Sequence, residues 1–168
     1  INNCKFDLVV KNFLGKRKII KNIVLNLIGK HNILNSVAAI SVCLNLGIKI
    51  KIIKRALLKF TGVQRRMTKI FEKNNNEFYD DYAHHPTEIY SVLESIKNVA
   101  NKKKITSVFQ PHRYSRVNFL KEEFSKSFKF SDRVVLCPIY AAGEKINKKF
   151  DILKFARMIS VNSDVNVI

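Results

Sequence analysis

The sequence is poor in glycine and lacks the glycine-rich loops that bind phosphates in many enzymes. Only 5 of its 168 residues are Gly. It contains no G-x-G-x-x-G dinucleotide fingerprint and no complete P-loop, because Gly15-Lys16 and Gly29-Lys30 lack the upstream Gly and the following Ser or Thr. A Ser or Cys nucleophile elbow is missing as well. The chain as given therefore holds no complete phosphate cradle.

Cysteine and long apolar runs are also scarce. The three cysteines, Cys4, Cys43 and Cys137, lie far apart and form no CxxC pair. An odd, unpatterned set is typical of a reducing cytosol and not of a disulfide scaffold. No apolar stretch approaches the roughly 18–20 residues that span a bilayer, and no secretory leader opens the chain. We therefore expect neither a membrane protein nor a secreted precursor.

Acidic residues are few, which leaves a large positive charge. The chain has 31 Lys and Arg against 13 Asp and Glu, a formal net charge of +18. A basic nucleic-acid-binding module is one interpretation. However, 23 of the basic residues are Lys and only 8 are Arg, and specific phosphate and base contacts favour Arg. The Lys residues are spread through every predicted element, so a solvated surface that reflects A/T-rich codons remains the alternative.

The first third of the chain predicts a hairpin followed by two helices. Apolar and basic stretches alternate over residues 4–28 around a connection at residues 12–17, which is typical of a β-hairpin. A helix with apolar residues around most of its circumference begins near His31. We expect it to be largely buried, with Asn32 as its N-cap and Gly47 at its C-terminal end. A second helix over residues 50–60 presents one apolar face, formed by Ile53, Ala56, Leu57 and Phe60.

The rest of the chain alternates strands with helices after a linker at residues 61–66. Strands are predicted at residues 67–71, 77–82, 105–109, 133–138 and 165–168, and helices at 86–100, 115–130 and 151–159. Pro86 suits the first turn of its helix. This alternation predicts an α/β fold with a parallel, doubly wound sheet.

Three polar segments follow predicted strands, at residues 80–86, 110–116 and 140–144. The carboxyl ends of parallel strands share one edge, so we expect the segments to converge there. Arg113 and Arg116 lie three residues apart at a predicted helix start, which makes a receptor for a carboxylate or a phosphate. Taken singly, each segment could also be a capping turn or a surface basic patch. The acidic and His residues at 80–85 could bind a metal, but they supply too few certain ligands for a structural metal site.

Five motifs occur in an order and spacing that resembles a known family: GKHNILNSVAAI at residues 29–40, the linker at 60–66, then DDYAHHPTE, FQPHRYSR and YAAGE. Together they closely resemble the Mur ligase family of bacterial peptidoglycan synthesis, over nearly the whole chain. The resemblance implies that residues 1–64 are the last hairpin and helices of a central ATPase domain. Residues 65–168 would be most of a Rossmann-like C-terminal domain. It also implies a P-loop, a UDP pocket and most Mg²⁺ ligands upstream of residue 1. Ile28 departs from the family, which usually has Pro there.

The resemblance further implies a bacterial cytoplasmic ligase that uses ATP and Mg²⁺ to join L-alanine to UDP-N-acetylmuramate through an acyl phosphate. FQPHRYSR favours this member over the murein tripeptide ligase of cell-wall recycling. A fragment without catalysis of its own is a third possibility. Carried over by motif, the nucleotide side would comprise His31, Asn32, Asn35, Arg65, Arg66 and Asp81. The catalytic set would be His84, near the phosphate and metal, with His112, Arg113 and Arg116, which would orient the amino-acid carboxylate and the acyl phosphate.

Overall fold

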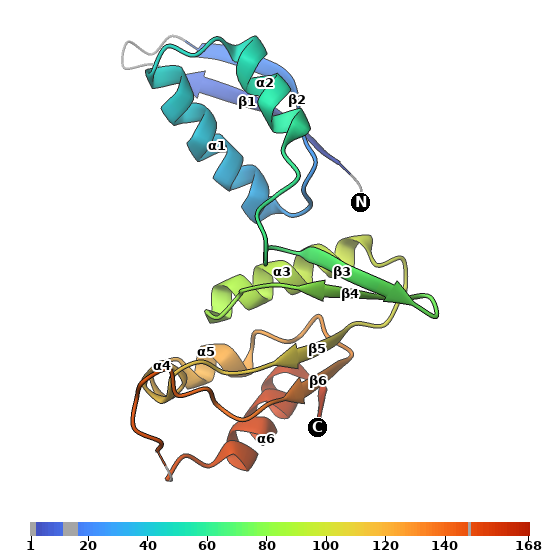
Figure 1. Cartoon of the computed structure of the whole chain (residues 1–168), viewed down its shortest axis with the longest axis vertical. Helices are drawn as coiled ribbons and strands as arrows, with labels where there is room; N and C mark the ends of the chain where they lie inside the picture. The colour runs from blue at the N-terminus through green and yellow to red at the C-terminus, as the bar shows by residue number, and fades with distance from the viewer. Residues whose placement is uncertain (1–2, 12–16, 148) are drawn as a thin grey trace. The chain divides into compact units, whose positions relative to one another are not determined.

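The computed structural model describes residues 3–11, 17–147 and 149–168 (Figure 1). The contacts within it divide the chain into two compact units, Ile1–Asp80 and Asp81–Ile168. Each unit has its own apolar core. Among the described residues, no helix has the length and apolar character needed to cross a membrane.

The first unit begins with the predicted hairpin. Strands β1 (Cys4–Lys11) and β2 (Arg17–Leu25) pair antiparallel. Every second residue of β1 faces the core, and Phe6, Leu8 and Val10 pack against the cluster that contains Ile20 and Ile23. The hairpin prediction is thus confirmed, while most of its connection falls outside the described residues.

Helix α1 (Lys30–Asn45) ends as predicted but begins differently. Gly47 has a φ of +75°, and the amides of Gly47 and Ile48 donate to the carbonyls of Leu44 and Cys43, which makes a Schellman C-cap. The predicted Asn32 N-cap is wrong. Gly29 is the N-cap, and the Asn32 side-chain amide donates to the Ile28 carbonyl at 2.8 Å, which is a donor role and not the acceptor role of a cap.

The expectation that α1 is largely buried is also wrong. Only Ser36 and Ile40 are buried, whereas Leu34, Val42 and Leu46 are 59%, 60% and 73% exposed. Helix α1 has apolar residues on several sides, but its neighbours within this unit cover only one of them. These neighbours are the β1–β2 hairpin and α2 (Ile50–Lys59). On the apolar face predicted for α2, Ile53 is buried and Leu57 partly so, whereas Ala56 and the C-cap residue Phe60 are exposed.

A second hairpin, β3 (Thr68–Lys73) and β4 (Asn76–Asp80), completes this unit. Its turn residues Asn74 and Asn75 both have positive φ, as the tight turns of two-residue hairpins require. Phe71 and Phe78 stack across it at 4.2 Å between ring centroids. Among the described strands, β3 and β4 pair only with each other. The expectation that residues 80–86 follow a strand of the parallel sheet is therefore wrong.

The second unit confirms the parallel α/β layer. Strands β5 (Thr106–Phe109), β6 (Arg133–Leu136) and β7 (Asn166–Val167) are parallel and lie in that order. Helix α3 (Pro86–Val99) precedes β5, with Pro86 in its first turn as predicted, and α6 (Ile152–Ser163) connects β6 to β7.

The single helix predicted at residues 115–130 is instead two short ones, α4 (Tyr114–Phe119) and α5 (Lys121–Ser125). Leu120 breaks them at φ −106° and ψ 25°, and Glu122 and Glu123 then favour a fresh helix start. The hydroxyls of Ser125 and Ser127 donate to nearby carbonyls and compete with further helical bonds.

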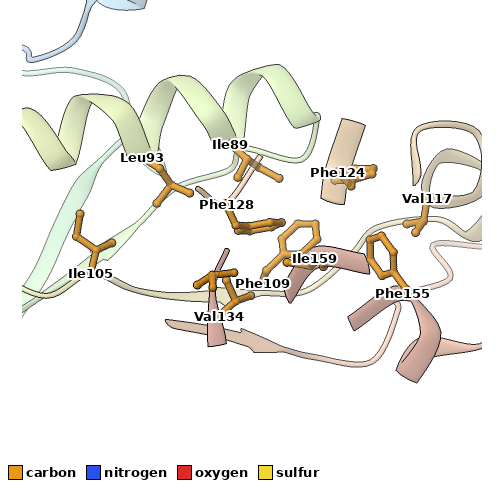
Figure 2. Packing of buried hydrophobic residues seen from close by; sticks show 11 residues of the cluster. Ile89, Leu93, Ile105, Phe109, Val117, Phe124, Phe128, Val134, Phe155 and Ile159 are labelled. Atoms are coloured by element: carbon orange, nitrogen blue, oxygen red, sulfur yellow. The ribbon is translucent and has the colours of Figure 1, made fainter. Parts of the chain in front are cut away.

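Aromatic packing forms the core of this unit (Figure 2). The Phe109 ring on β5 lies 5.1 Å from that of Phe128 and 5.7 Å from that of Phe124, centroid to centroid. Ile89 and Leu93 point from α3 into the same cluster. This packing fixes β5, and with it the segment that follows β5, against the helices.

Replacing Phe124 tests this core. Phe124 is fully buried, whereas Phe119, five residues earlier, is 86% exposed. We expect Phe124→Ala to lower the free energy of unfolding of this unit by about 3–5 kcal/mol, because it leaves a cavity among aromatic rings. The matched control Phe119→Ala should change it by no more than about 0.5 kcal/mol. Urea unfolding followed through NMR signals of β6 measures both, and equal effects would show that the core is placed wrongly.

Candidate functional site

The segments after β5 and β6 meet at one edge of the parallel sheet. The ladder ends where Phe109 pairs with Leu136, and past the strand ends a separate parallel bridge, shifted by one residue in register, pairs His112 with Tyr140. The Arg113 amide donates to the Tyr140 carbonyl, and the Tyr140 amide donates to the Pro111 carbonyl, both at 2.9 Å. For residues 110–116 and 140–144 the predicted convergence is confirmed.

A carboxylate joins the same two segments a second time. Glu144 accepts hydrogen bonds from the backbone amide of Ser115, at 3.1 Å, and from the Ser115 hydroxyl. These two bonds are the main cause of a pKa for Glu144 below its ordinary value. Sequence reasoning gave Glu144 no role, since its partner lies 29 residues away. In the sequence, the only indication that Glu144 belongs to the site was its position in the third polar segment.

His112 and Arg116 carry buried polar atoms that face no partner. Within the described part of the chain, His112 Nδ1 and Arg116 Nη1 are buried and make no hydrogen bond. Burial lowers the pKa of His112, and the charges of Arg116, Arg113 and His84 lower it further, while Glu144 opposes them. His112 is therefore neutral at pH 7. Arginine nitrogen is only a donor, so the arrangement suits an anion or another acceptor.

Arg113 occupies a strained position beside these atoms. It is the N-cap of α4, with φ +69° and ψ +126°, and its side chain is exposed. A residue other than glycine held at such a φ costs about 1–3 kcal/mol, and such strain clusters at ligand-binding positions. The strained backbone leaves the guanidinium at the surface, three residues before Arg116.

The remaining polar segment forms a capping turn. Asp81 Oδ1 accepts from the Ala83 amide at 2.7 Å, and Glu88 Oε2 accepts from the amides of His84 and His85 at 3.1 and 3.3 Å. His84 Nδ1 lies 2.9 Å from the Tyr82 carbonyl oxygen, so that nitrogen carries the proton. The turn thus has the capping role that sequence alone allowed. His84 also lowers the pKa of His112, so the His84 ring lies close enough to the site to interact with it electrostatically.

The other predicted residues belong to the first unit. His31 and Asn32 lie in the first turn of α1, and Asn35 follows one turn later, exposed. Arg65 Nε lies 3.4 Å from Asp80 Oδ2, and the Arg66 amide donates to the Val63 carbonyl at 3.2 Å. Across the described ranges no three His, Cys, Asp or Glu side chains gather into a metal site.

Comparisons with known proteins agree with the resemblance of the motifs. The family model described as Mur ligase, glutamate ligase domain, matches residues 65–167. A UDP-N-acetylmuramate–L-alanine ligase of Pelagibacter ubique is 50% identical over 164 residues, which are 97% of this chain and 35% of that protein. One from Rickettsia rickettsii is 47% identical over 148 residues, 86% of this chain and 30% of that protein.

Solved structures give the same result. The crystal structure of UDP-N-acetylmuramate-alanine ligase MurC from Thermotoga maritima superposes with a TM-score of 0.69 at 28% identity, over 90% of this chain and 34% of that one. The chain thus spans about a third of the length of the relatives that it matches.

The strain at Arg113 can be measured by replacing it with glycine and with alanine. Glycine adopts positive φ at no steric cost, so Arg113→Gly should be more stable than Arg113→Ala by about 1 kcal/mol. Exposed Arg157 within α6 is the control, where Gly should be less stable than Ala by about 1 kcal/mol. Urea unfolding of the four variants gives both differences. The same sign at both positions would contradict the strained backbone.

Proposed function

Because the chain belongs to the Mur ligase family, we propose that it is the C-terminal part of an ATP-dependent ligase that joins L-alanine to UDP-N-acetylmuramate. The 50% identity to the Pelagibacter ubique enzyme, over 97% of this chain, supports this choice of member within the family. The observation that carries the proposal is the pair of buried, unpartnered nitrogens of His112 and Arg116 beside the guanidinium of Arg113.

In the proposed reaction ATP phosphorylates the lactyl carboxylate of the sugar, the amino group of L-alanine attacks the acyl phosphate, and phosphate leaves. Negative charge gathers on phosphoryl and carboxylate oxygens throughout, so the reaction depends on positioning and on neutralising that charge. Arg113 and Arg116 would bind the carboxylate of L-alanine and the acyl phosphate. His112, which is neutral because its pKa is lowered, would bind one of these groups by hydrogen bonding without adding charge.

We propose that His31, Asn32 and Asn35 lie on the adenine side of the nucleotide, and that Arg66, Arg65 and Asp81 reach the phosphates or ribose. His84 would lie near the transferred phosphate. Mg²⁺, which neutralises nucleotide phosphates when bound, would take most of its ligands from residues outside this chain, as the family resemblance implies.

We place the domain boundary at residues 64–65, which gives a C-terminal ATPase segment at 1–64 and a Rossmann-like ligase domain at 65–168. The start of the family match at residue 65 supports this division, which assigns the β3–β4 hairpin to the ligase domain. We propose a bacterial cytoplasmic location, because ATP and UDP-sugars are cytoplasmic substrates.

A chimeric enzyme tests the function of this chain. In it, the matching 164 residues of the Pelagibacter ubique ligase are replaced by this chain. We expect ADP formation that requires both L-alanine and UDP-N-acetylmuramate, with the alanyl product identified by mass spectrometry. A folded chimera that binds ATP but forms no product would contradict the proposal.

Within this chimera, Arg113→Ala and Arg116→Ala should each lower kcat/KM for L-alanine by at least about tenfold, equivalent to about 1.4 kcal/mol of transition-state stabilisation. The control is Arg157→Ala on α6, an exposed arginine outside the site, which should leave kcat/KM unchanged. Steady-state assays with L-alanine varied measure all three. Wild-type turnover in both site variants would refute their assignment.

A further inference from the structure

Helix α4 cannot cap its own N-terminus. Its N-cap residue is Arg113, and no side chain at that position accepts a hydrogen bond from the first turn. A guanidinium group has donors only, so it leaves the orphan amides of the first turn unsatisfied. With 6 residues, α4 is also far too short to be stable without tertiary contacts.

Glu144 supplies the missing acceptor from another segment. One carboxylate oxygen accepts from the Ser115 amide and the other from the Ser115 hydroxyl. Two bonds from one carboxylate to one residue fix its orientation as well as its position, and a negative charge at a helix N-terminus is favourable. Ser115 stands between Arg113 and Arg116 in the chain, so holding Ser115 holds the backbone of both arginines.

The position of the Glu144 carboxylate indicates whether it holds the arginine receptor in place or takes part in the chemistry there. A carboxylate next to two arginines and an anion would weaken anion binding by repulsion. Both Glu144 oxygens accept from Ser115. These bonds, with smaller contributions from the Tyr114 backbone and the Arg113 charge, lower its pKa and keep it ionised. It is thus suited to hold the receptor and unsuited to serve as a proton acceptor in it.

We propose that Glu144 is a positioning residue, which orients Arg113 and Arg116 toward their anion by clamping Ser115 at the start of α4. The identity of that anion, the L-alanine carboxylate or the acyl phosphate, rests on the proposed function. The clamp itself rests only on contacts within the second unit.

Hydrogen exchange of the 168-residue chain tests the clamp without any activity. In Glu144→Ala the Ser115 amide loses its acceptor, and its exchange should be about tenfold faster, while amides of β6 keep their rates. Glu123→Gln, at an exposed glutamate of α5, is the control and should change neither. An unchanged Ser115 rate in Glu144→Ala overturns the proposal, whatever the activity of the chimera.

Kinetics of the chimera test the positioning role. Glu144→Ala should raise KM for L-alanine about tenfold, because Arg113 and Arg116 lose their orientation toward the bound anion, and leave KM for ATP within about twofold. Glu144→Gln keeps an acceptor for the Ser115 amide, so it should restore most of the affinity. An equal rise in both KM values, or a Gln variant as impaired as the Ala variant, overturns positioning through Ser115. An inactive unsubstituted chimera refutes the proposed function instead.

Discussion

The parallel pairing of β5 with β6 is the constraint on which the second unit depends. Parallel strands end at the same edge, and here the two segments that follow them pair again, one residue out of the ladder's register, at the His112–Tyr140 bridge. That bridge brings two loops 28 residues apart in sequence into contact. The first of them carries His112 and Arg116, each with a buried nitrogen that makes no hydrogen bond within the described residues. The buried phenylalanines matter to the site because they hold β5, and therefore its loop, in place.

The ability of the site to bind an anion depends on where its positive charges lie and not on the net charge of the chain. The net charge of +18 comes mostly from Lys, and within the described residues the lysines that make hydrogen bonds or ion pairs do so at exposed positions such as Lys54 and Lys69. Such pairs contribute little to stability. Arg116 differs because one of its nitrogens is buried, and a cation removed from water interacts far more strongly with an anion than one that is fully solvated.

Local patterns predicted most of the elements but few of the contacts. Alternation and turn residues were enough for the first hairpin, and Pro86 and Gly47 marked helix ends correctly, because these signals act within a few residues. Burial of α1 was predicted wrongly, since periodicity shows which residues are apolar and not which neighbours cover them. The clamp by Glu144 could not be predicted at all, because it depends on strand register and not on spacing. The roles of the site residues came from the family resemblance and remain predictions.

The most direct test of an anion receptor at this edge is a phosphate titration of the isolated chain, followed by NMR of its arginine and histidine side chains. We expect inorganic phosphate to shift the signals of His112, Arg113 and Arg116 together, with one affinity, while those of Arg133 and Arg157 stay in place. Shifts of equal size at all the arginines would mean diffuse attraction to a basic surface. That result would contradict a built site.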